Sequence, residues 1–305
     1  MHPKILRGSV SQKSVVLYQN KTVYMKNIVI TGVSTGIGYA TAKKFIAEGH
    51  RVFGSVRKQS DADTLTADLG PYFEPLIFDV IDDKAVLEAA EIVKKRVGTE
   101  GVALLVNNAG IAVSGPLQHI DNDEFIHQFN INVFGVQRVT QAFLPLLGAG
   151  FDKVPKGKIV NVSSISGIIS TAFLGPYCAS KAALNAMTDS LRRELVLFDI
   201  PVVIVQPGPI KTPIWEKARQ EINFYPDTEY AQLLESSLKK IDTSEKQAVP
   251  VEQVSDLIYQ IFKNPKPKTR YIVVKNKAVI KLISWLPHAW LDAILKRQMM
   301  ASLKK

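Results

Sequence analysis

Short runs of β-branched and aliphatic residues alternate with longer amphipathic segments from residue 26 onward. Such runs are typical of buried strands, and the longer segments carry apolar residues at the spacing of helices that cover a sheet. Because strand and helix alternate regularly, the pattern predicts an α/β fold with one doubly wound parallel sheet and helices on both faces. Strands are expected at 28–31, 52–56, 75–80, 103–108, 158–164, 202–206 and 271–274, and helices at 37–48, 82–97, 122–147, 177–198 and 251–262.

Three stretches fall outside this alternation. Residues 1–25 form a basic N-terminal extension and 276–305 a basic C-terminal extension, while 209–250 is a long connection rich in apolar and aromatic residues. Long insertions in compact domains commonly act as lids, so 209–250 is interpreted as a helical lid. Apolar spacing in 278–300 predicts an amphipathic pair of helices broken at Pro287.

Charge is segregated along the chain, which has 38 basic and 28 acidic residues and a net charge of +10. Residues 1–27 hold five basic and no acidic residues, and 263–305 hold eleven basic residues against Asp292 alone. The mildly acidic remainder has no basic aromatic stripe, which argues against nucleic-acid binding. The basic tail could instead contact a membrane surface peripherally, or pack on the substrate pocket or a second subunit.

Other classes are disfavoured by simple counts. The single cysteine, Cys178, excludes an intrachain disulfide. No apolar stretch reaches the ~20 residues that a bilayer-spanning helix needs. The five histidines have no metal-ligand spacing, so no metal site is predicted. We therefore expect a cytoplasmic protein, with membrane-surface association through the tail as the open alternative.

Residues 31–38 read TGVSTGIG and join the first expected strand to the first expected helix. Glycines here permit a tight turn and let backbone N–H groups approach a pyrophosphate, while the helix N-terminus adds partial positive charge. In this strand–turn–helix context the spacing predicts a dinucleotide site. The expected contacts are Gly32, Ser34, Thr35, Gly36, Ile37 and Gly38.

Tyr177 and Lys181 lie four residues apart in an expected helix and so share one face. A neighbouring ammonium lowers the pKa of a phenol, which is otherwise about 10, and makes it a usable acid or base near neutrality. Ser164 ends an expected strand, from which it can donate a hydrogen bond to a substrate oxygen. These three residues are the candidate catalytic group.

The TGxxxGIG spacing, NNAG at 107–110, Asn132, the YxxxK of Tyr177 and Lys181, and PGPIKT at 207–212 together resemble the short-chain dehydrogenase/reductase superfamily. The resemblance covers 26–275 and implies a Rossmann-type dinucleotide-binding and catalytic domain there. It implies a catalytic tetrad, assembly as a homodimer or homotetramer, and kinship with retinol- and hydroxysteroid-dehydrogenase-like members. The tetrad consists of Asn132, Ser164, Tyr177 and Lys181.

The same resemblance implies a role for each site residue. Tyr177 is the general acid or base and Ser164 stabilises the substrate oxygen. Lys181 holds the nicotinamide ribose, and Asn132 anchors a water that links Lys181 to solvent. Further cofactor contacts are implied for Asp79, Val80, Asn108, Ile210 and Thr212, besides Tyr177 and Lys181.

The end of the second expected strand bears on cofactor choice. An acid there binds the ribose 2′-OH of NAD, whereas a basic residue accommodates the 2′-phosphate of NADP. This chain has Val56, then Arg57 and Lys58. NADP(H) is therefore the expected cofactor, with Arg57 as its phosphate contact and NAD(H) as the alternative.

The expected substrate side is apolar. Residues 165–175 and 209–250 are rich in apolar and aromatic residues and poor in arginine, which favours a lipophilic ketone, aldehyde or alcohol of steroid, retinoid or fatty type. Two alternatives stay open at this point. One is a 3-oxoacyl-thioester reductase, and the other is a non-catalytic NADP-binding scaffold or regulator.

Overall fold

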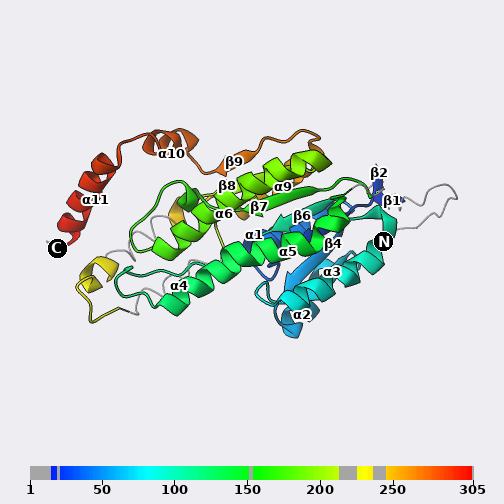
Figure 1. Cartoon of the computed structure of the whole chain (residues 1–305), viewed down its shortest axis with the longest axis horizontal. Helices are drawn as coiled ribbons and strands as arrows, with labels where there is room; N and C mark the ends of the chain where they lie inside the picture. The colour runs from blue at the N-terminus through cyan, green and yellow to red at the C-terminus, as the bar shows by residue number, and fades with distance from the viewer. Residues whose placement is uncertain (1–14, 19–20, 151–153, 213–224, 236–244, 304–305) are drawn as a thin grey trace.

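A seven-stranded parallel sheet forms the centre of the computed structural model, which describes residues 15–18, 21–150, 154–212, 225–235 and 245–303 (Figure 1). Its strand order is β5-β4-β3-β6-β7-β8-β9, and every neighbouring pair is parallel. The order reverses between β3 and β6, so their carboxyl ends form the crevice where such sheets bind ligands. The strands are β3 (Asn27–Ile30), β4 (Arg51–Val56), β5 (Phe73–Ile77), β6 (Leu104–Asn107), β7 (Lys158–Val162), β8 (Val202–Pro207) and β9 (Arg270–Val273).

Helices cover both faces of this sheet, which confirms the predicted fold class. One hydrophobic core joins the sheet to α1, α2 and α9, and a second joins it to α3, α5 and the end of α6. In Figure 1, α3, α5 and α6 lie in front of the sheet. The helices are α1 (Gly36–Ala47), α2 (Gln59–Leu69), α3 (Asp83–Val97), α4 (Asn122–Phe129), α5 (Val136–Phe143), α6 (Gly175–Glu194) and α9 (Val251–Lys263).

Alternate residues of a central strand pack into the two different cores. Ile28 and Ile30 pack into the core of α1 and α9, whereas Val29 between them packs into the core of α3 and α5. Successive side chains of a strand point to opposite faces, so a strand covered on both faces must be apolar at every position. This explains why the strands read as continuous apolar runs.

Two helix ends are fixed by single residues. The Asp82 side chain caps α3 by accepting a hydrogen bond from the Ala85 N–H at 3.0 Å. Gly49, just beyond α1, has a φ of 84°, which a glycine adopts without a steric penalty. Both residues fix where the chain turns back toward the next strand.

Three features differ from the sequence prediction. The expected helix at 122–147 is not one α-helix, because the π-helical η2 (Asn130–Gly135) separates α4 from α5 and the 3-10 η3 (Leu144–Leu147) ends it. Helix α2 was not expected, since its sequence QSDADTLTADL buries only Ala62, Leu65 and Leu69. The N-terminal extension also contains an antiparallel pair, β1 (Val15–Tyr18) and β2 (Lys21–Tyr24). Short 3-10 turns are η1 (Gly98–Glu100), η4 (Ile165–Gly167) and η5 (Leu195–Phe198).

The predicted helix pair in the tail is present as α10 (Lys277–Ile283) and α11 (His288–Leu303), on either side of Pro287. Within the described residues, no helix is long and apolar enough to span a membrane. Residues 213–224 and 236–244 of the predicted lid, and 1–14 and 19–20 of the N-terminal extension, lie outside the described residues.

Candidate active site

The glycine turn lies at the carboxyl end of β3, directly against the chain that follows β6. Gly32 has a φ of +69°, and a Cβ there would lie 2.9 Å from the Ala109 Cα. A Cβ on Gly38 would lie 2.1 Å from the Gly32 carbonyl oxygen. Both positions therefore require glycine, and the turn is as tight as the sequence predicts.

Asn108 fixes this turn through hydrogen bonds from its side chain and its backbone. Its Nδ2 donates to the Thr31 and Gly32 carbonyl oxygens at 3.0 and 2.9 Å, while its backbone N–H donates to Thr31 Oγ1 at 2.9 Å. The amide nitrogen of Asn108 is thus used to shape the glycine turn. This is a positioning contact that the sequence alone did not reveal.

The start of α1 has the features of an anion site. Its N-cap residue Thr35 makes no side-chain cap hydrogen bond, and the first turn holds no acidic residue. Uncapped N–H groups at a helix N-terminus favour a phosphate. Gly36 has a φ of +61°, and a Cβ there would lie 3.4 Å from the Thr212 methyl carbon. These residues fit a dinucleotide pyrophosphate between the turn and Thr212.

The remaining residues of the predicted cofactor site have distinct environments. Ser34 and Thr35 are exposed at the turn, whereas Ile37 packs against the core. Ile210 is buried and pairs with Val249 through an isolated parallel bridge, which places the chain before Thr212 beside the crevice.

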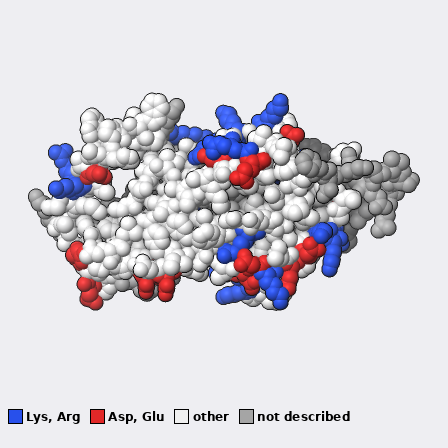
Figure 2. Space-filling model, in the orientation of Figure 1, with Lys and Arg blue, Asp and Glu red and all other residues white. Residues whose placement is uncertain are grey.

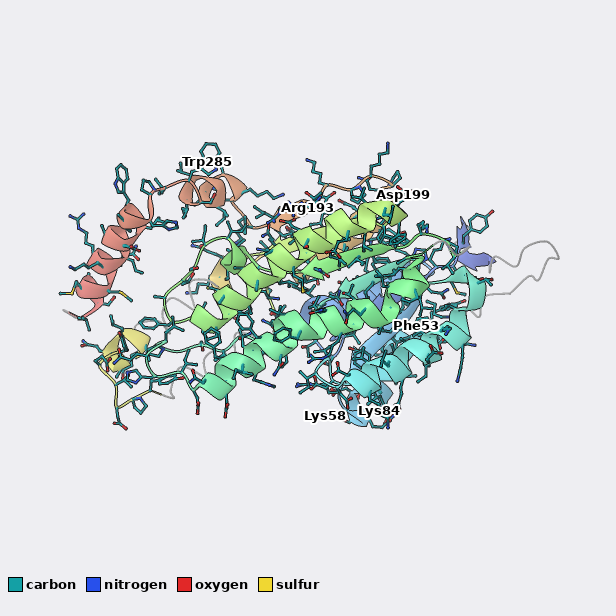
Figure 3. The ribbon with its side chains drawn as sticks, in the orientation of Figure 1. Phe53, Lys58, Lys84, Arg193, Asp199 and Trp285 are labelled. Carbon is teal, nitrogen blue, oxygen red and sulfur yellow. The ribbon has the colours of Figure 1, made fainter. Side chains whose placement is uncertain are left out.

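Arg57 and Asp79 meet at the carboxyl ends of β4 and β5. The Arg57 Nη1 lies 3.9 Å from the Asp79 Oδ2, and the Arg57 side chain is 69% exposed. Val80 is buried, with its Cγ2 2.7 Å from where a Cβ of Gly135 would lie. The neighbouring Lys58 begins α2 and is labelled at this end of the molecule in Figure 3.

Ser164 and Tyr177 meet across the crevice, as the sequence predicts. Ser164 is buried after the end of β7, where its Oγ accepts a hydrogen bond from the Ser166 N–H at 3.0 Å and donates to the Pro207 carbonyl at 3.5 Å. Tyr177 lies in the first turn of α6 and shares a side-chain hydrogen bond with Ser164. The returning chain therefore places two hydroxyl groups together.

Lys181 lies one turn further along α6 and is buried. Its Nζ donates to the Val162 carbonyl oxygen at 3.0 Å and lies 5.7 Å from the centre of the Tyr177 ring. Burial lowers the pKa of Lys181 from 10.5 to about 8, because the ammonium has lost its water.

The pKa of Tyr177 is a correction to the sequence prediction. Burial raises this pKa above its ordinary value, and the hydrogen bond with Ser164 opposes the rise. Lys181 contributes no lowering, and its Nζ instead donates to the Val162 carbonyl oxygen. Here the loss of water outweighs the hydrogen bond with Ser164, so burial favours the protonated phenol.

Asn132 connects this pair to the chain after β6. It is fully buried in η2, where its Oδ1 accepts from the Ile111 N–H at 3.0 Å and its Nδ2 donates to the Ile111 carbonyl at 3.0 Å. A Cβ on Gly110 would lie 3.1 Å from the Asn132 Oδ1 and 3.7 Å from the Lys181 Nζ. Gly110 therefore lets Asn132 and Lys181 approach each other.

The comparisons with known proteins agree with this geometry. A family model described as short chain dehydrogenase matches residues 26–223. The chain belongs to this family. It is 42% identical over 276 residues to the NADPH-dependent 3-dehydrocapnine reductase of Ornithobacterium rhinotracheale, covering 90% of this chain and 98% of that protein. It is 32% identical to retinol dehydrogenase 16 of Mus musculus, covering 88% of this chain and 87% of that one.

Solved structures show the same fold. A short-chain dehydrogenase from Streptomyces avermitilis superposes with a TM-score of 0.71 at 27% identity, covering 92% of this chain and 96% of that one. A short-chain dehydrogenase/reductase from Burkholderia phymatum in complex with NAD has a TM-score of 0.73 at 22% identity, covering 88% and 95%. The protein is thus an oxidoreductase of the short-chain dehydrogenase family, which acts on carbonyl and CH–OH groups.

An aromatic cluster that the sequence does not single out lies around the start of α6. Phe173, just before α6, has a φ of 68°, which is uncommon for a residue with a side chain. Its ring packs edge-on against Tyr230 at 5.7 Å between ring centres, and His119 lies 6.1 Å from the same tyrosine. His119 also contacts the Glu229 carboxylate at 3.1 Å.

These aromatic residues come from three segments far apart in sequence, namely 111–120, 168–176 and 225–235. Gly115 joins two of them, because its N–H donates to the Phe173 carbonyl at 2.8 Å and a Cβ on it would lie 2.6 Å from the Tyr225 ring. The composition of these segments predicts an apolar wall in general. No spacing in the sequence identifies which aromatic residues meet.

Proposed function

We propose that this short-chain dehydrogenase reduces a lipophilic ketone with NADPH, with Tyr177 as the proton donor. The proposal rests on two consecutive residues, one of which contacts the dinucleotide turn and the other the catalytic lysine. Ala109 lies against Gly32 of the dinucleotide turn, and Gly110 lies against Lys181. The anion-binding turn and the Tyr177 hydroxyl therefore face the same crevice.

The residues of this chain divide the work as follows. Ser164 orients the substrate carbonyl oxygen, and the Tyr177 hydroxyl donates a proton to it. Lys181 replaces the proton on Tyr177, and Asn132 positions Lys181 and the water that connects it to solvent. NADPH, when bound, supplies the hydride that reduces the carbonyl carbon.

NADPH is the favoured cofactor. Arg57 is largely exposed at the carboxyl end of β4, where its Nη1 lies 3.9 Å from the Asp79 Oδ2, so its guanidinium is available to a 2′-phosphate. Val56 provides no acid for the ribose of NAD. The name of the O. rhinotracheale relative also includes NADPH dependence. NAD(H) is then the weaker cofactor.

A ketone on a lipophilic molecule fits the substrate side best. The segments 111–120, 165–175 and 225–235 contain no lysine or arginine, while Phe173, Tyr225 and Tyr230 supply apolar surface. The two named relatives are a retinol dehydrogenase and a reductase of a 3-dehydro compound. A 3-oxoacyl thioester on a carrier would need cations for its phosphopantetheine, which these segments lack. A non-catalytic NADP-binding scaffold would have no use for the Ser164 hydroxyl beside the Tyr177 hydroxyl.

Assembly and location complete the proposal. The chain forms a homodimer or homotetramer through α4, α5 and α6, and residues 276–305 make peripheral contact with a membrane. Ile126 of α4 and Phe134, between α4 and α5, are exposed apolar side chains, and they support assembly through that surface.

The function is tested by following the absorbance of reduced nicotinamide. Protein, NADPH or NADH, and a panel of long-chain ketones, retinoid aldehydes, steroid ketones and oxoacyl thioesters are mixed separately. We expect turnover with NADPH and at least one long-chain ketone. Turnover confined to thioesters would identify the alternative enzyme, and tight NADPH binding without turnover on any substrate would indicate a scaffold.

A further inference from the structure

The tail presents a row of large apolar side chains to solvent. We call this row the tail face, made up of Val279, Leu282, Trp285, Trp290 and Ile294. Trp285 is 80% exposed, and both Leu282 and Trp290 are 65% exposed. Figure 3 shows Trp285 directed away from the rest of the molecule. Large apolar side chains gathered in one exposed place mark an interaction surface.

The spacing of these residues is that of an interfacial helix. Val279, Leu282 and Trp285 follow each other at intervals of three, and Trp290 and Ile294 lie one turn apart on α11. Leu291 and Leu295 lie about 100° further round α11 and are partly buried, so the most exposed apolar side chains of this helix belong to the tail face.

Positive charge borders the tail face. Lys275 precedes α10 and Lys277 begins it, and Lys296 and Arg297 follow Ile294 on α11. Asp292 is the only acidic residue from 263 to 305. Figure 2 shows Lys and Arg side chains standing beside uncharged surface where Figure 1 draws α11.

An open stretch of the α11 surface combines the same two chemistries. It is made up of Ala293, Lys296, Arg297, Met300 and Ala301. Tryptophan and aliphatic side chains beside lysine and arginine match the boundary between acyl chains and anionic headgroups. An acidic protein would pair with the cations alone and leave the tryptophan rings in water.

We infer that the tail face docks on an anionic lipid bilayer and turns the substrate crevice toward it. The tail contacts the substrate side through the Gln232 Nε2, which donates to the Leu303 carbonyl at 3.4 Å. Two residues before Gln232, Tyr230 packs on Phe173 beside the site. Resting on the proposed function, this arrangement delivers a lipophilic ketone from the bilayer rather than from water.

Vesicle co-sedimentation of the full chain tests the docking directly. We expect binding to vesicles of phosphatidylcholine mixed with phosphatidylglycerol, weaker binding to phosphatidylcholine alone, and loss of binding at high salt. Trp285→Ala combined with Trp290→Ala, or Lys296→Glu combined with Arg297→Glu, should weaken binding about tenfold or more. Unchanged binding by both double variants would overturn the inference.

Matched controls separate this result from misfolding and from self-association. Leu87→Ala combined with Ile92→Ala removes two exposed apolar side chains of α3 and should leave vesicle binding unchanged. Thermal unfolding of each tail variant should match that of the parent. If the parent does not bind vesicles and a tail variant changes the oligomeric state in sedimentation, a second copy of the chain covers the tail face. That result would contradict the inference.

A second readout separates delivery from chemistry. Anionic vesicles should raise the turnover of a long-chain ketone several-fold in the parent but not in the tryptophan variant, and should not affect a short water-soluble ketone. Equal stimulation of both proteins would refute delivery through the tail face. If no ketone is turned over, the proposed function fails, while the co-sedimentation result still decides the docking.

Discussion

The cofactor side and the substrate side of the crevice are built in different ways. On the cofactor side, a Cβ on Gly32 would lie 2.9 Å from the Ala109 Cα and one on Gly38 would lie 2.1 Å from the Gly32 carbonyl oxygen, so the backbone requires glycine at both positions. On the substrate side, the Phe173 and Tyr230 rings pack together, and His119 contacts both Tyr230 and Tyr225. These rings come from segments that are far apart in the sequence. The cofactor side is thus fixed by close backbone contacts, and the substrate side by contacts between side chains.

The largest effect is expected where the two sides meet. Tyr177→Phe removes the hydroxyl that gives the proton to the substrate, so turnover should fall about 10³-fold. NADPH affinity should stay within about threefold, since the phenyl ring keeps its place. Steady-state kinetics and fluorescence titration of NADPH measure the two quantities. Near-normal turnover in this variant would refute the assignment of the proton donor.

On the cofactor side, Arg57→Asp should shift the ratio of kcat/KM for NADPH and NADH about 10²-fold toward NADH. It removes a charge-assisted contact to the 2′-phosphate and adds a second acid beside Asp79. Arg193→Asp is the matched control, because Arg193 is an exposed arginine of α6, well away from Lys58 in Figure 3. An unchanged ratio in the Arg57 variant would reject this phosphate contact.

Two alanine substitutions test how tightly the glycine turn packs. Gly32 and Gly70 both have positive φ, at +69° and +77°, but only a Cβ on Gly32 meets backbone, whereas nothing lies within 4 Å of one on Gly70. Both substitutions strain the backbone by about 1–3 kcal/mol. We expect Gly32→Ala to lower the free energy of unfolding by about 2 kcal/mol more than Gly70→Ala, and to abolish NADPH binding. Equal losses in chemical denaturation would contradict the close approach to Ala109.

The lowered pKa of Lys181 predicts that the free energy of unfolding depends on pH. Its folded pKa of about 8 lies below the ordinary 10.5, so the unfolded chain binds one more proton between these values. The free energy of unfolding should therefore rise with pH in this window, by about 2 kcal/mol from about pH 8 to about pH 9.5. Lys181→Met should lack this rise. Parallel slopes for the two proteins in urea unfolding would show that the amine is not desolvated.

The smallest effect is expected on the substrate side. Phe173→Ala removes a ring from the apolar wall, so KM for a long-chain ketone should rise about tenfold, while kcat and the NADPH affinity change little. A short ketone does not reach the wall and serves as the internal control. If both ketones lose equally, Phe173 positions α6 rather than the substrate.

The sequence predicts the cofactor side better than the substrate side for a physical reason. The glycine turn lies at a strand-to-helix junction, and Tyr177 and Lys181 lie four residues apart on one helix, so local spacing identifies each of these features. The parallel sheet then brings them to the same edge. The π-helical turn at Asn132 was missed because its hydrogen bonds to Ile111 and Ser180 depend on packing rather than on helix propensity. The raised pKa of Tyr177 was missed because burial cannot be read from a four-residue spacing.

The central claim is that this crevice brings a ketone and NADPH together for direct reduction. The claim is tested most directly with NADPH that carries deuterium on the transferred position of the nicotinamide ring. Mass and NMR spectra of the alcohol should show one deuterium on the carbinol carbon, on a single face. With unlabelled NADPH in deuterated water, the same carbon should carry no deuterium. Alcohol formed without that deuterium, or no alcohol from any lipophilic ketone, would contradict the account.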